Sequence, residues 1–247
     1  MTETSWESAG RTHAGCLRPH NEDAWVARGA DGLWMVADGM GGHAAGDRAS
    51  RMVAEAVGAL DAAAPLPEFV DRVDDTLEGA NRDIRAWAEA ELEGRTMGCT
   101  VVALVARGDV GVCLWAGDSR LYRLRGDELL QVSRDHDPFE ELVERGELTP
   151  EEADARGEAS VVTRAIGAAP ELHLDVLAFD TAPGDLFLLC SDGLYRELGA
   201  RELRDLLVAG GSLEALADRL LQGALERGAR DNVTVLLARR GAAGASP

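Results

Sequence analysis

The spacing of apolar residues predicts several amphipathic helices. In 45–60 and again in 69–88, apolar residues recur about every three to four positions, and the opposite face is charged. Helices of this kind lie on the outside of an apolar layer. The same spacing predicts further helices near 201–208 and 213–226, and short helical pieces near 138–145 and 150–156.

Short runs of apolar and β-branched residues predict strands between the helices. Most of these runs end in a turn that contains glycine, asparagine or aspartate. The predicted strands are 33–37, 100–106, 110–116, 121–125, 172–179, 186–190 and 233–238. Strands and helices therefore come in separate groups along the chain.

This order excludes the regular alternation of strand and helix that builds a parallel sheet. We expect an α+β fold with mainly antiparallel sheets and helices on their outer faces. No linker or internal repeat divides the chain, so residues 1–240 form one predicted domain. Within this domain, the charged segment at about 133–167 is a predicted surface excursion. After the domain, residues 241–247 form a predicted flexible tail.

Composition limits the partners of the chain. Its 247 residues are 46% hydrophobic, and 44 acidic residues against 25 Lys and Arg give a net charge of −19. An anionic surface repels nucleic acid and anionic lipid, so we expect neither as a partner. No apolar run approaches the roughly 20 residues that cross a bilayer, and residues 1–10 contain no apolar signal region. A cytoplasmic location is therefore predicted, without membrane association.

The four cysteines indicate neither a zinc site nor a disulfide framework. Cys16, Cys99, Cys113 and Cys190 form no Cys-x-x-Cys pair, and none lies near a histidine at zinc-binding spacing. Each lies in or beside an apolar stretch, so we expect buried, reduced thiols.

Five short acidic motifs lie at predicted strand ends or turns. They are Asn21-Glu22-Asp23, Asp38-Gly39, Gly117-Asp118-Ser119, Ser191-Asp192-Gly193 and Asp231-Asn232. Carboxylates gathered at one edge of a sheet repel each other and need cations. Their hard oxygens favour magnesium, manganese or calcium over zinc or copper. Because the motifs are scattered along the chain, they exclude a calcium loop of EF-hand type and favour a two-metal hydrolytic centre.

Arg18 precedes the first acidic motif and has two interpretations. A guanidinium binds phosphate through two parallel hydrogen bonds, so the first interpretation makes Arg18 the clamp of a substrate phosphate. The alternative is a structural salt bridge to one of the carboxylates. The neighbouring metal motifs favour the phosphate role, but the residue alone leaves both open.

Together these stretches resemble the metal-dependent serine/threonine protein phosphatases of the type 2C (PPM) family, in their bacterial form. The resemblance covers about residues 6–239, and its motifs occur in the family's order and at its approximate spacing. They are Arg18-Pro-His-Asn-Glu-Asp23, Val36-Ala-Asp-Gly-Met-Gly-Gly-His43, Gly98-Cys-Thr100, Gly117-Asp-Ser-Arg120, Ser133-Arg-Asp-His136, Val162-Thr-Arg-Ala-Ile-Gly167, Ser191-Asp-Gly193 and Asp231-Asn-Val-Thr234.

The resemblance implies a central sandwich of two mainly antiparallel β-sheets, flanked by a helical layer on each side. It also implies two or three divalent metal ions, Mn or Mg, and hydrolysis of phosphoserine and phosphothreonine in proteins. A metal-activated water would attack phosphorus in line, without a covalent intermediate. The implied partners are phosphorylated proteins and a cognate Ser/Thr kinase, and we expect a monomer.

The resemblance assigns roles to single residues. Asp38 bridges two metals, the Gly39 carbonyl binds one of them, and Asp192 and Asp231 ligate the other. Glu22 binds a metal through a water molecule, and Asp23 beside it supports the site. Asp118, together with Asp192, binds a third metal, and Arg18 holds the substrate phosphate.

Two positions depart from the family pattern. Animal members carry a histidine, proposed as general acid, directly after the Asp-Gly pair, and Met40 stands there in this chain. Methionine has no proton to donate, so water on a third metal is one alternative donor and His43 a weaker one. Relatives often carry His-Pro-x-Arg before Val162–Gly167, whereas this chain reads Ala155-Arg-Gly-Glu-Ala-Ser160, which leaves the conformation of the excursion open.

Three functions remain open at this point. The first is an active phosphoprotein phosphatase, whose expected catalytic residues are Arg18, Asp38, Asp192 and Asp231. A regulatory module that kept the fold and lost catalysis should lack at least one carboxylate, and the motifs contain all of them. Hydrolysis of a small phosphoester needs the same metal centre, so the sequence does not separate this function from the first.

Overall fold

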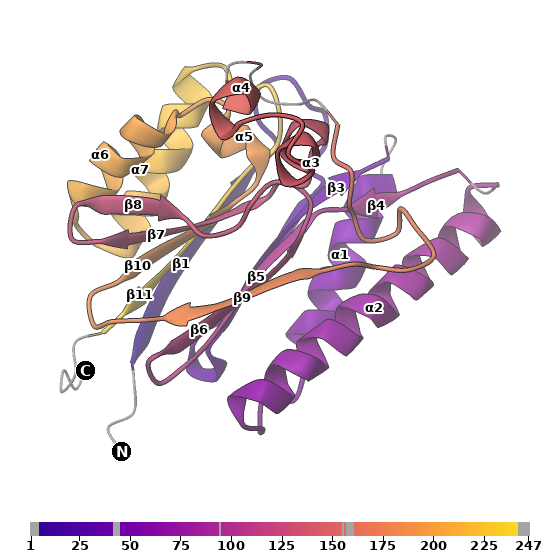
Figure 1. Ribbon diagram of the computed structural model, residues 1–247, viewed down its shortest axis with the longest axis horizontal. Helices are drawn as coiled ribbons and strands as arrows, with labels where there is room; N and C mark the ends of the chain where they lie inside the picture. The colour runs from indigo at the N-terminus through magenta and orange to yellow at the C-terminus, as the bar shows by residue number, and fades with distance from the viewer. Residues whose placement is uncertain (1–4, 42–44, 94, 155, 157–160, 242–247) are drawn as a thin grey trace.

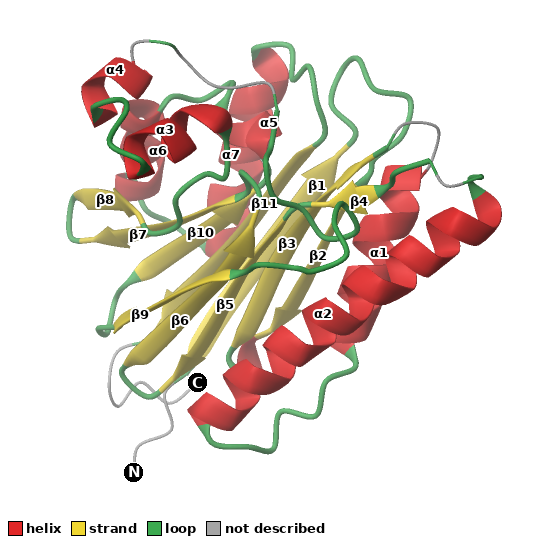
Figure 2. Ribbon diagram, turned by 45° about the vertical axis from the view of Figure 1, so that its right-hand side comes forward, coloured by secondary structure: helices red, strands yellow, loops and turns green. Residues whose placement is uncertain are grey.

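The computed structural model describes residues 5–41, 45–93, 95–154, 156 and 161–241. Two antiparallel β-sheets face each other at its centre, and helices cover the outer face of each sheet (Figure 1). The turned view shows the same layers (Figure 2), which confirm the predicted α+β sandwich. His43, most of 155–160 and the end of the predicted tail lie outside the described residues.

Every pairing between strands of the two sheets is antiparallel. The first sheet has the order β1 (Trp6–His13), β11 (Val233–Arg240), β10 (Leu186–Cys190), β7 (Arg120–Arg125) and β8 (Glu128–Gln131). The second has the order β2 (Asp23–Arg28), β3 (Leu33–Met40), β5 (Val101–Arg107), β6 (Val110–Ala116) and β9 (Asp175–Asp180), and β4 (Gly98–Cys99) pairs with the end of β3.

The helices form two layers and one excursion. The layer on the second sheet consists of α1 (Ala45–Gly58) and α2 (Leu66–Glu91), after the short 3-10 helix η1 (Gly29–Asp31). The layer on the first sheet consists of α5 (Asp192–Tyr195), α6 (Ala200–Val208) and α7 (Leu213–Glu226). The excursion carries α3 (Pro138–Glu144) and α4 (Pro150–Asp154). In the described part of the chain, no helix has the length and apolar character that a membrane span requires.

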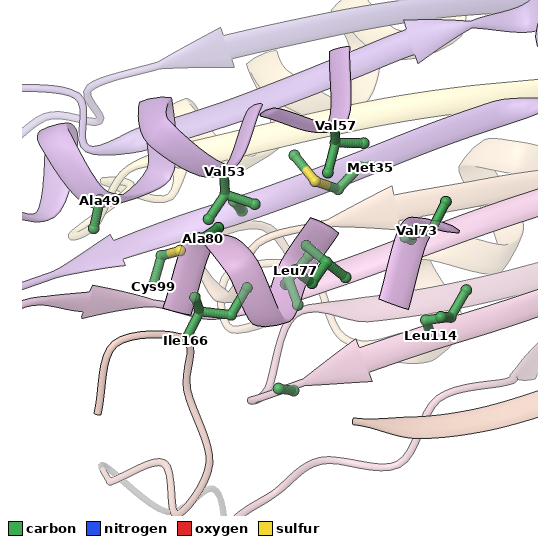
Figure 3. Packing of buried hydrophobic residues seen from close by; sticks show 14 of the residues in the cluster. Met35, Ala49, Val53, Val57, Val73, Leu77, Ala80, Cys99, Leu114 and Ile166 are labelled. Carbon is green, nitrogen blue, oxygen red and sulfur yellow. The ribbon is translucent and has the colours of Figure 1, made fainter. Parts of the chain in front are cut away.

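Alternating side chains on the strands build three apolar layers. On β3, Leu33, Met35 and Ala37 pack against α1 and α2, whereas Trp34 and Val36 point into the layer between the two sheets. Figure 3 shows the helix-facing layer, where Met35 lies among Val53 and Val57 of α1 and side chains of α2. Both faces of β3 are therefore buried from Leu33 to Ala37, the residue before Asp38.

Four strands of the two sheets were not predicted. The sequence pattern predicted no strand at β1, β2, β4 or β8, and β9 begins at Asp175 rather than 172. In β1 just one residue, Ala9, is buried, because this strand lies at the edge of its sheet and presents polar side chains on both faces. An edge strand of this kind has no apolar run for a sequence pattern to detect.

Candidate metal centre

The acidic motifs lie where strands of both sheets end. Asp23 begins β2 and is paired across the strands with Asp38, near the end of β3. Asp118 follows β6, Asp192 follows β10 and begins α5, and Asp231 precedes β11. Antiparallel pairing brings these ends together, so carboxylates from both sheets meet at one edge of the sandwich.

Asp38 lies at the centre of this group of charges. Burial of its carboxyl group raises the pKa of Asp38 well above its usual range. Four neighbouring negative charges add to this rise: those of Asp23, Asp192, Asp118 and Asp231. The ionised form of Asp38 is therefore opposed by burial and by four like charges. A nearby cation would remove this opposition.

Asp23 is anchored through one oxygen. Its Oδ2 accepts hydrogen bonds from Ser191 Oγ at 2.8 Å and from Thr234 Oγ1 at 2.6 Å. Its Oδ1 is buried and has no hydrogen-bond partner among the described residues. Burial raises the pKa of Asp23 to about 7; the two hydrogen bonds oppose this rise, and Asp192 and Asp231 add to it. A buried oxygen in this state suits a cation, or a water that a cation holds.

Asn232 fixes the loop that carries Glu22. Its Oδ1 accepts the Glu22 N–H at 2.8 Å, and its Nδ2 donates to the carbonyls of Ala14 at 3.0 Å and His20 at 2.9 Å. From the other side, Ser50 Oγ on α1 donates to the Glu22 carbonyl at 2.6 Å. The backbone at Glu22 is thus held between Asn232, the residue before β11, and Ser50 of α1.

Close backbone packing explains the glycine after Asp38. The Gly39 N–H donates to the Glu22 carbonyl at 3.1 Å. A Cβ at Gly39 would lie 2.3 Å from the Gly46 carbonyl oxygen of α1 and 2.5 Å from that of Glu22. No larger residue fits between the two backbones, so the first turn of α1 and the Glu22 loop fix the position of Asp38-Gly39.

Arg18 pairs with a predicted ligand. Its Nη2 lies 2.7 Å from Asp231 Oδ2, and 54% of the Arg18 side chain is exposed. The salt bridge of the second interpretation is therefore present in this structure. An exposed ion pair contributes only about 0–1 kcal/mol, so a phosphate from solvent can compete for the guanidinium.

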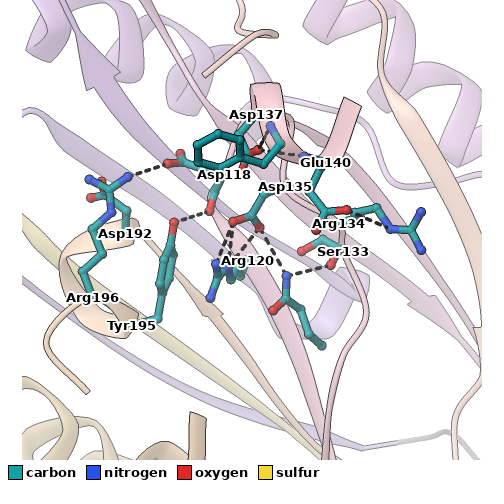
Figure 4. Close-up of polar contacts among 12 residues, drawn as sticks. Asp118, Arg120, Ser133, Arg134, Asp135, Asp137, Glu140, Asp192, Tyr195 and Arg196 are labelled. Carbon is teal, nitrogen blue, oxygen red and sulfur yellow. Dashed lines mark hydrogen bonds and ion pairs between the residues drawn. The ribbon is translucent and has the colours of Figure 1, made fainter. Parts of the chain in front are cut away.

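Arg196 pairs with two further carboxylates. Its Nη2 donates to Asp118 Oδ2 at 3.2 Å, and its Nη1 lies 2.8 Å from Asp192 Oδ2 (Figure 4). Burial and the charge of Asp192 raise the pKa of Asp118 to about 7, and Arg196 opposes this rise. Asp118 therefore lies among charges of both signs.

The donor chemistry of this edge fits divalent metal ions. Within the described ranges, no three carboxylate, imidazole or thiolate groups stand in a ready metal-binding arrangement, and arginines pair with Asp231, Asp118 and Asp192. The fit rests instead on the convergence of like charges on Asp38 and on the unpartnered Oδ1 of Asp23. Hard oxygens gathered with such a charge excess suit Mg²⁺ or Mn²⁺.

A comparison with models of protein families decides to which family the chain belongs. The model of the family "Protein phosphatase 2C" matches residues 10–237, which is most of the chain. The chain belongs to the protein phosphatase 2C family. Membership confirms the predicted enzyme class, a protein-serine/threonine phosphatase.

Individual relatives agree with this membership. Serine/threonine phosphatase stp of Listeria innocua serovar 6a is 33% identical over 237 residues, which cover 93% of this phosphatase and 94% of the relative. The structure of PppA, a key regulatory component of T6SS in Pseudomonas aeruginosa, is 42% identical, with a TM-score of 0.87 and coverage of 97% and 100%. The catalytic domain of PstP in complex with two manganese ions is 34% identical, with a TM-score of 0.85 and coverage of 96% and 99%.

Several residues at the centre of this phosphatase received no role from the sequence. Ser191, Asn232 and Thr234 lie inside the quoted motifs, but their hydrogen bonds depend on segments far away in the chain. Arg196 lies one helical turn after Asp192, where the two side chains share a face, but the sequence predicted no helix at this point. Met40 pairs with Gly98 at the end of β3, beside the centre, and its side chain has no proton to donate.

Proposed function

We propose that this phosphatase hydrolyses phosphoserine and phosphothreonine in proteins, with two or more divalent metal ions and without a covalent enzyme intermediate. The observation that carries the proposal is the convergence of four carboxylates on Asp38. The manganese ions of the PstP structure support a metal-dependent reaction. We place the activity in a single domain, residues 1–240.

The proposed metal ligands follow the acidic motifs. Asp38 would lie between two ions, with the Gly39 carbonyl on one of them and Asp192 and Asp231 on the other. Glu22 would bind through a water. When bound, such ions lower the pKa of a water molecule and offset the charge of a phosphoryl group.

The protein supplies position and charge. Ser191 and Thr234 hold Asp23 at the back of the site, where its carboxylate supports the ligands in front of it. Asn232 and Ser50 fix the backbone at Glu22. In this proposal the phosphate of the substrate replaces Asp231 as the partner of the Arg18 guanidinium. Arg18 then orients the phosphoryl group for in-line attack.

The surroundings of Cys99, whose thiol lies beside Asp38, support a reaction without a covalent intermediate. Cys99 is buried beside Asp38, and burial, reinforced by the charge of Asp38, raises the pKa of its thiol well above the usual range. A thiol in this state is not a nucleophile. Ser191 is buried as well, and its hydroxyl donates to Asp23. Neither side chain is prepared for attack on phosphorus.

The first experiment measures phosphate release from phosphoserine, phosphothreonine and phosphotyrosine peptides, in manganese and in a chelator. We expect release from the first two peptides in manganese and a return to background in the chelator, because the ions supply the charge that the site lacks. Equal release in the chelator would exclude the metal-dependent mechanism. Turnover of p-nitrophenyl phosphate without turnover of the peptides would favour the small phosphoester as substrate.

Arg18→Ala should mainly raise KM, by about tenfold, with a smaller change in kcat. The guanidinium binds the phosphate of the ground state as well as that of the transition state, so its loss weakens both. Steady-state kinetics with a phosphothreonine peptide measure the effect. Arg51→Ala removes another exposed, ion-paired guanidinium on α1 and serves as the matched control. An unchanged KM in Arg18→Ala would mean that Arg18 forms only the structural salt bridge to Asp231 and does not bind the phosphate.

The setting of the reaction is part of the proposal. Cys99, Cys113 and Cys190 are buried free thiols, while Cys16 is exposed, against the sequence prediction of burial. Free thiols are typical of a reducing compartment, which supports a cytoplasmic location. A kinase must supply the phosphorylated proteins that this enzyme consumes. The net charge of −19 opposes self-association and supports a monomer.

A further inference from the structure

A guanidinium lies between the two carboxylates that the family resemblance assigns to a third metal ion. Arg196 Nη2 is 3.2 Å from Asp118 Oδ2, and Arg196 Nη1 is 2.8 Å from Asp192 Oδ2. Figure 4 shows Arg196 beside Asp192, with its guanidinium directed at Asp118. The side chains of Asp118 and Asp192 are 10% and 11% exposed, so both carboxylates are largely buried, whereas 32% of the Arg196 side chain is exposed.

The local fold fixes Arg196 in this place. α5 begins at Asp192, and one helical turn brings Arg196 back to the same face, where its N–H donates to the Asp192 carbonyl at 3.0 Å. The preceding residue, Tyr195, donates its hydroxyl to the Asp118 carbonyl at 3.0 Å. One short helix therefore holds Asp118 through both its backbone and its side chain.

A second layer holds Tyr195 in turn. The Arg120 guanidinium lies 3.5 Å from the centre of the Tyr195 ring and makes an ion pair of 2.7 Å with Asp135, at the base of the excursion. Asp135 is 10% exposed and Arg120 17% exposed, so this pair is largely withdrawn from solvent. Arg196 itself reaches the surface, with 32% of its side chain exposed, but the groups that hold it in place are packed and largely buried (Figure 4).

A guanidinium and a divalent ion exclude each other at this position. Both are cations, both need the same carboxylate oxygens, and like charges a few ångströms apart repel strongly where water is scarce. An arginine remains charged at every physiological pH, so it does not leave by losing its proton. A third ion would have to displace a tethered side chain whose two partners are buried.

We propose that Arg196 takes the place of a third divalent ion, so that this chain works with two metal ions and a guanidinium at the third position. The inference rests on the proposed function for the two ions around Asp38. Asp118 then anchors Arg196 and is not a metal ligand in the wild-type protein. Arg196 is a positioning residue that keeps a fixed positive charge between Asp118 and Asp192.

Calorimetric titration of the metal-free protein with manganese tests this proposal without an activity assay. The wild type should bind about two ions, whereas Arg196→Met should bind about three, the third at least about tenfold more tightly than in the wild type. Arg196→Lys keeps the charge and should stay closer to the wild type. Arg201→Met removes an exposed arginine on α6 and is the matched control. Adding Asp118→Asn to Arg196→Met should abolish the gain.

Two results would overturn the proposal. One is a wild type that already binds three manganese ions of similar affinity, and the other is an Arg196→Met variant that gains none. If Arg196→Met does not fold by circular dichroism, Arg196→Gln is titrated in its place, because it keeps polar contacts and removes the charge. A wild type that binds no ion would instead contradict the proposed function, and the inference with it.

Discussion

Asp38→Asn should reduce manganese-dependent release of phosphate from a phosphothreonine peptide by at least about a thousandfold. The substitution keeps the size of the side chain and removes one charge from the point where the carboxylates converge. An amide offers one neutral oxygen where the proposal requires an anionic group between two cations. Both ions therefore lose a ligand at once, which explains the size of the expected effect.

The same variant should be more stable than the wild type when metal is absent. In the metal-free protein the ionised Asp38 is opposed by Asp23, Asp192, Asp118 and Asp231. Its neutral replacement removes this repulsion, and one pKa unit corresponds to about 1.4 kcal/mol, so a gain of at least about 1 kcal/mol is expected in chelator. Loss of activity together with a gain in stability is the signature of a binding site and not of a misfolded variant.

Asp83→Asn is the matched control for both effects. Asp83 is exposed on α2, away from the acidic edge, so neither activity nor stability should change. Near wild-type turnover in Asp38→Asn would contradict the proposed metal centre. Unfolding of the metal-free variant at a lower temperature than the wild type would contradict the electrostatic account of the cluster.

The metal-free protein should lose stability as the pH rises from about 5 to about 8, by about 2–4 kcal/mol. The pKa values of Asp23 and Asp118 are raised to about 7 in the folded state, against about 4 in an unfolded chain. The folded state therefore binds more protons than the unfolded state between these values. Stability from these groups is complete below about pH 4 and is lost as the pH rises through about 7.

Manganese should reverse this trend. The ions bind the deprotonated carboxylates, so their stabilising effect is largest at the pH where the metal-free protein is weakest. Thermal unfolding midpoints at the two pH values, in chelator and in manganese, measure this difference. Asp23→Asn should flatten the curve in chelator, and Asp83→Asn should leave it as it is in the wild type. A metal-free protein that gains stability over this pH range would refute the account.

The sequence predicted the long elements of the fold because their apolar faces are regular. The two amphipathic helices at 45–60 and 69–88 correspond to α1 and α2, whose inner faces are buried against the second sheet. By contrast, β1 and β2 lie at the sheet edges, and their mixed polar sequences carry no regular alternation. α5 is four residues long, too short to show a helical period.

The site was predictable as a set of residue types, and less so as a set of contacts. The acidic motifs indicated the edge at which carboxylates from both sheets meet. The sequence offered a salt bridge as one interpretation of Arg18, and the structure contains it, with Asp231 as partner. The role of Arg196 was not predicted, because it depends on the packing of α5 against Asp118, which joins segments 78 residues apart.

The central claim is that the carboxylates around Asp38 bind divalent ions. Titration of the metal-free protein with manganese, followed by calorimetry, tests it most directly when the wild type and Asp38→Asn are compared. The account predicts about two ions bound to the wild type and none of comparable affinity to the variant. Equal manganese binding by the two proteins would contradict it.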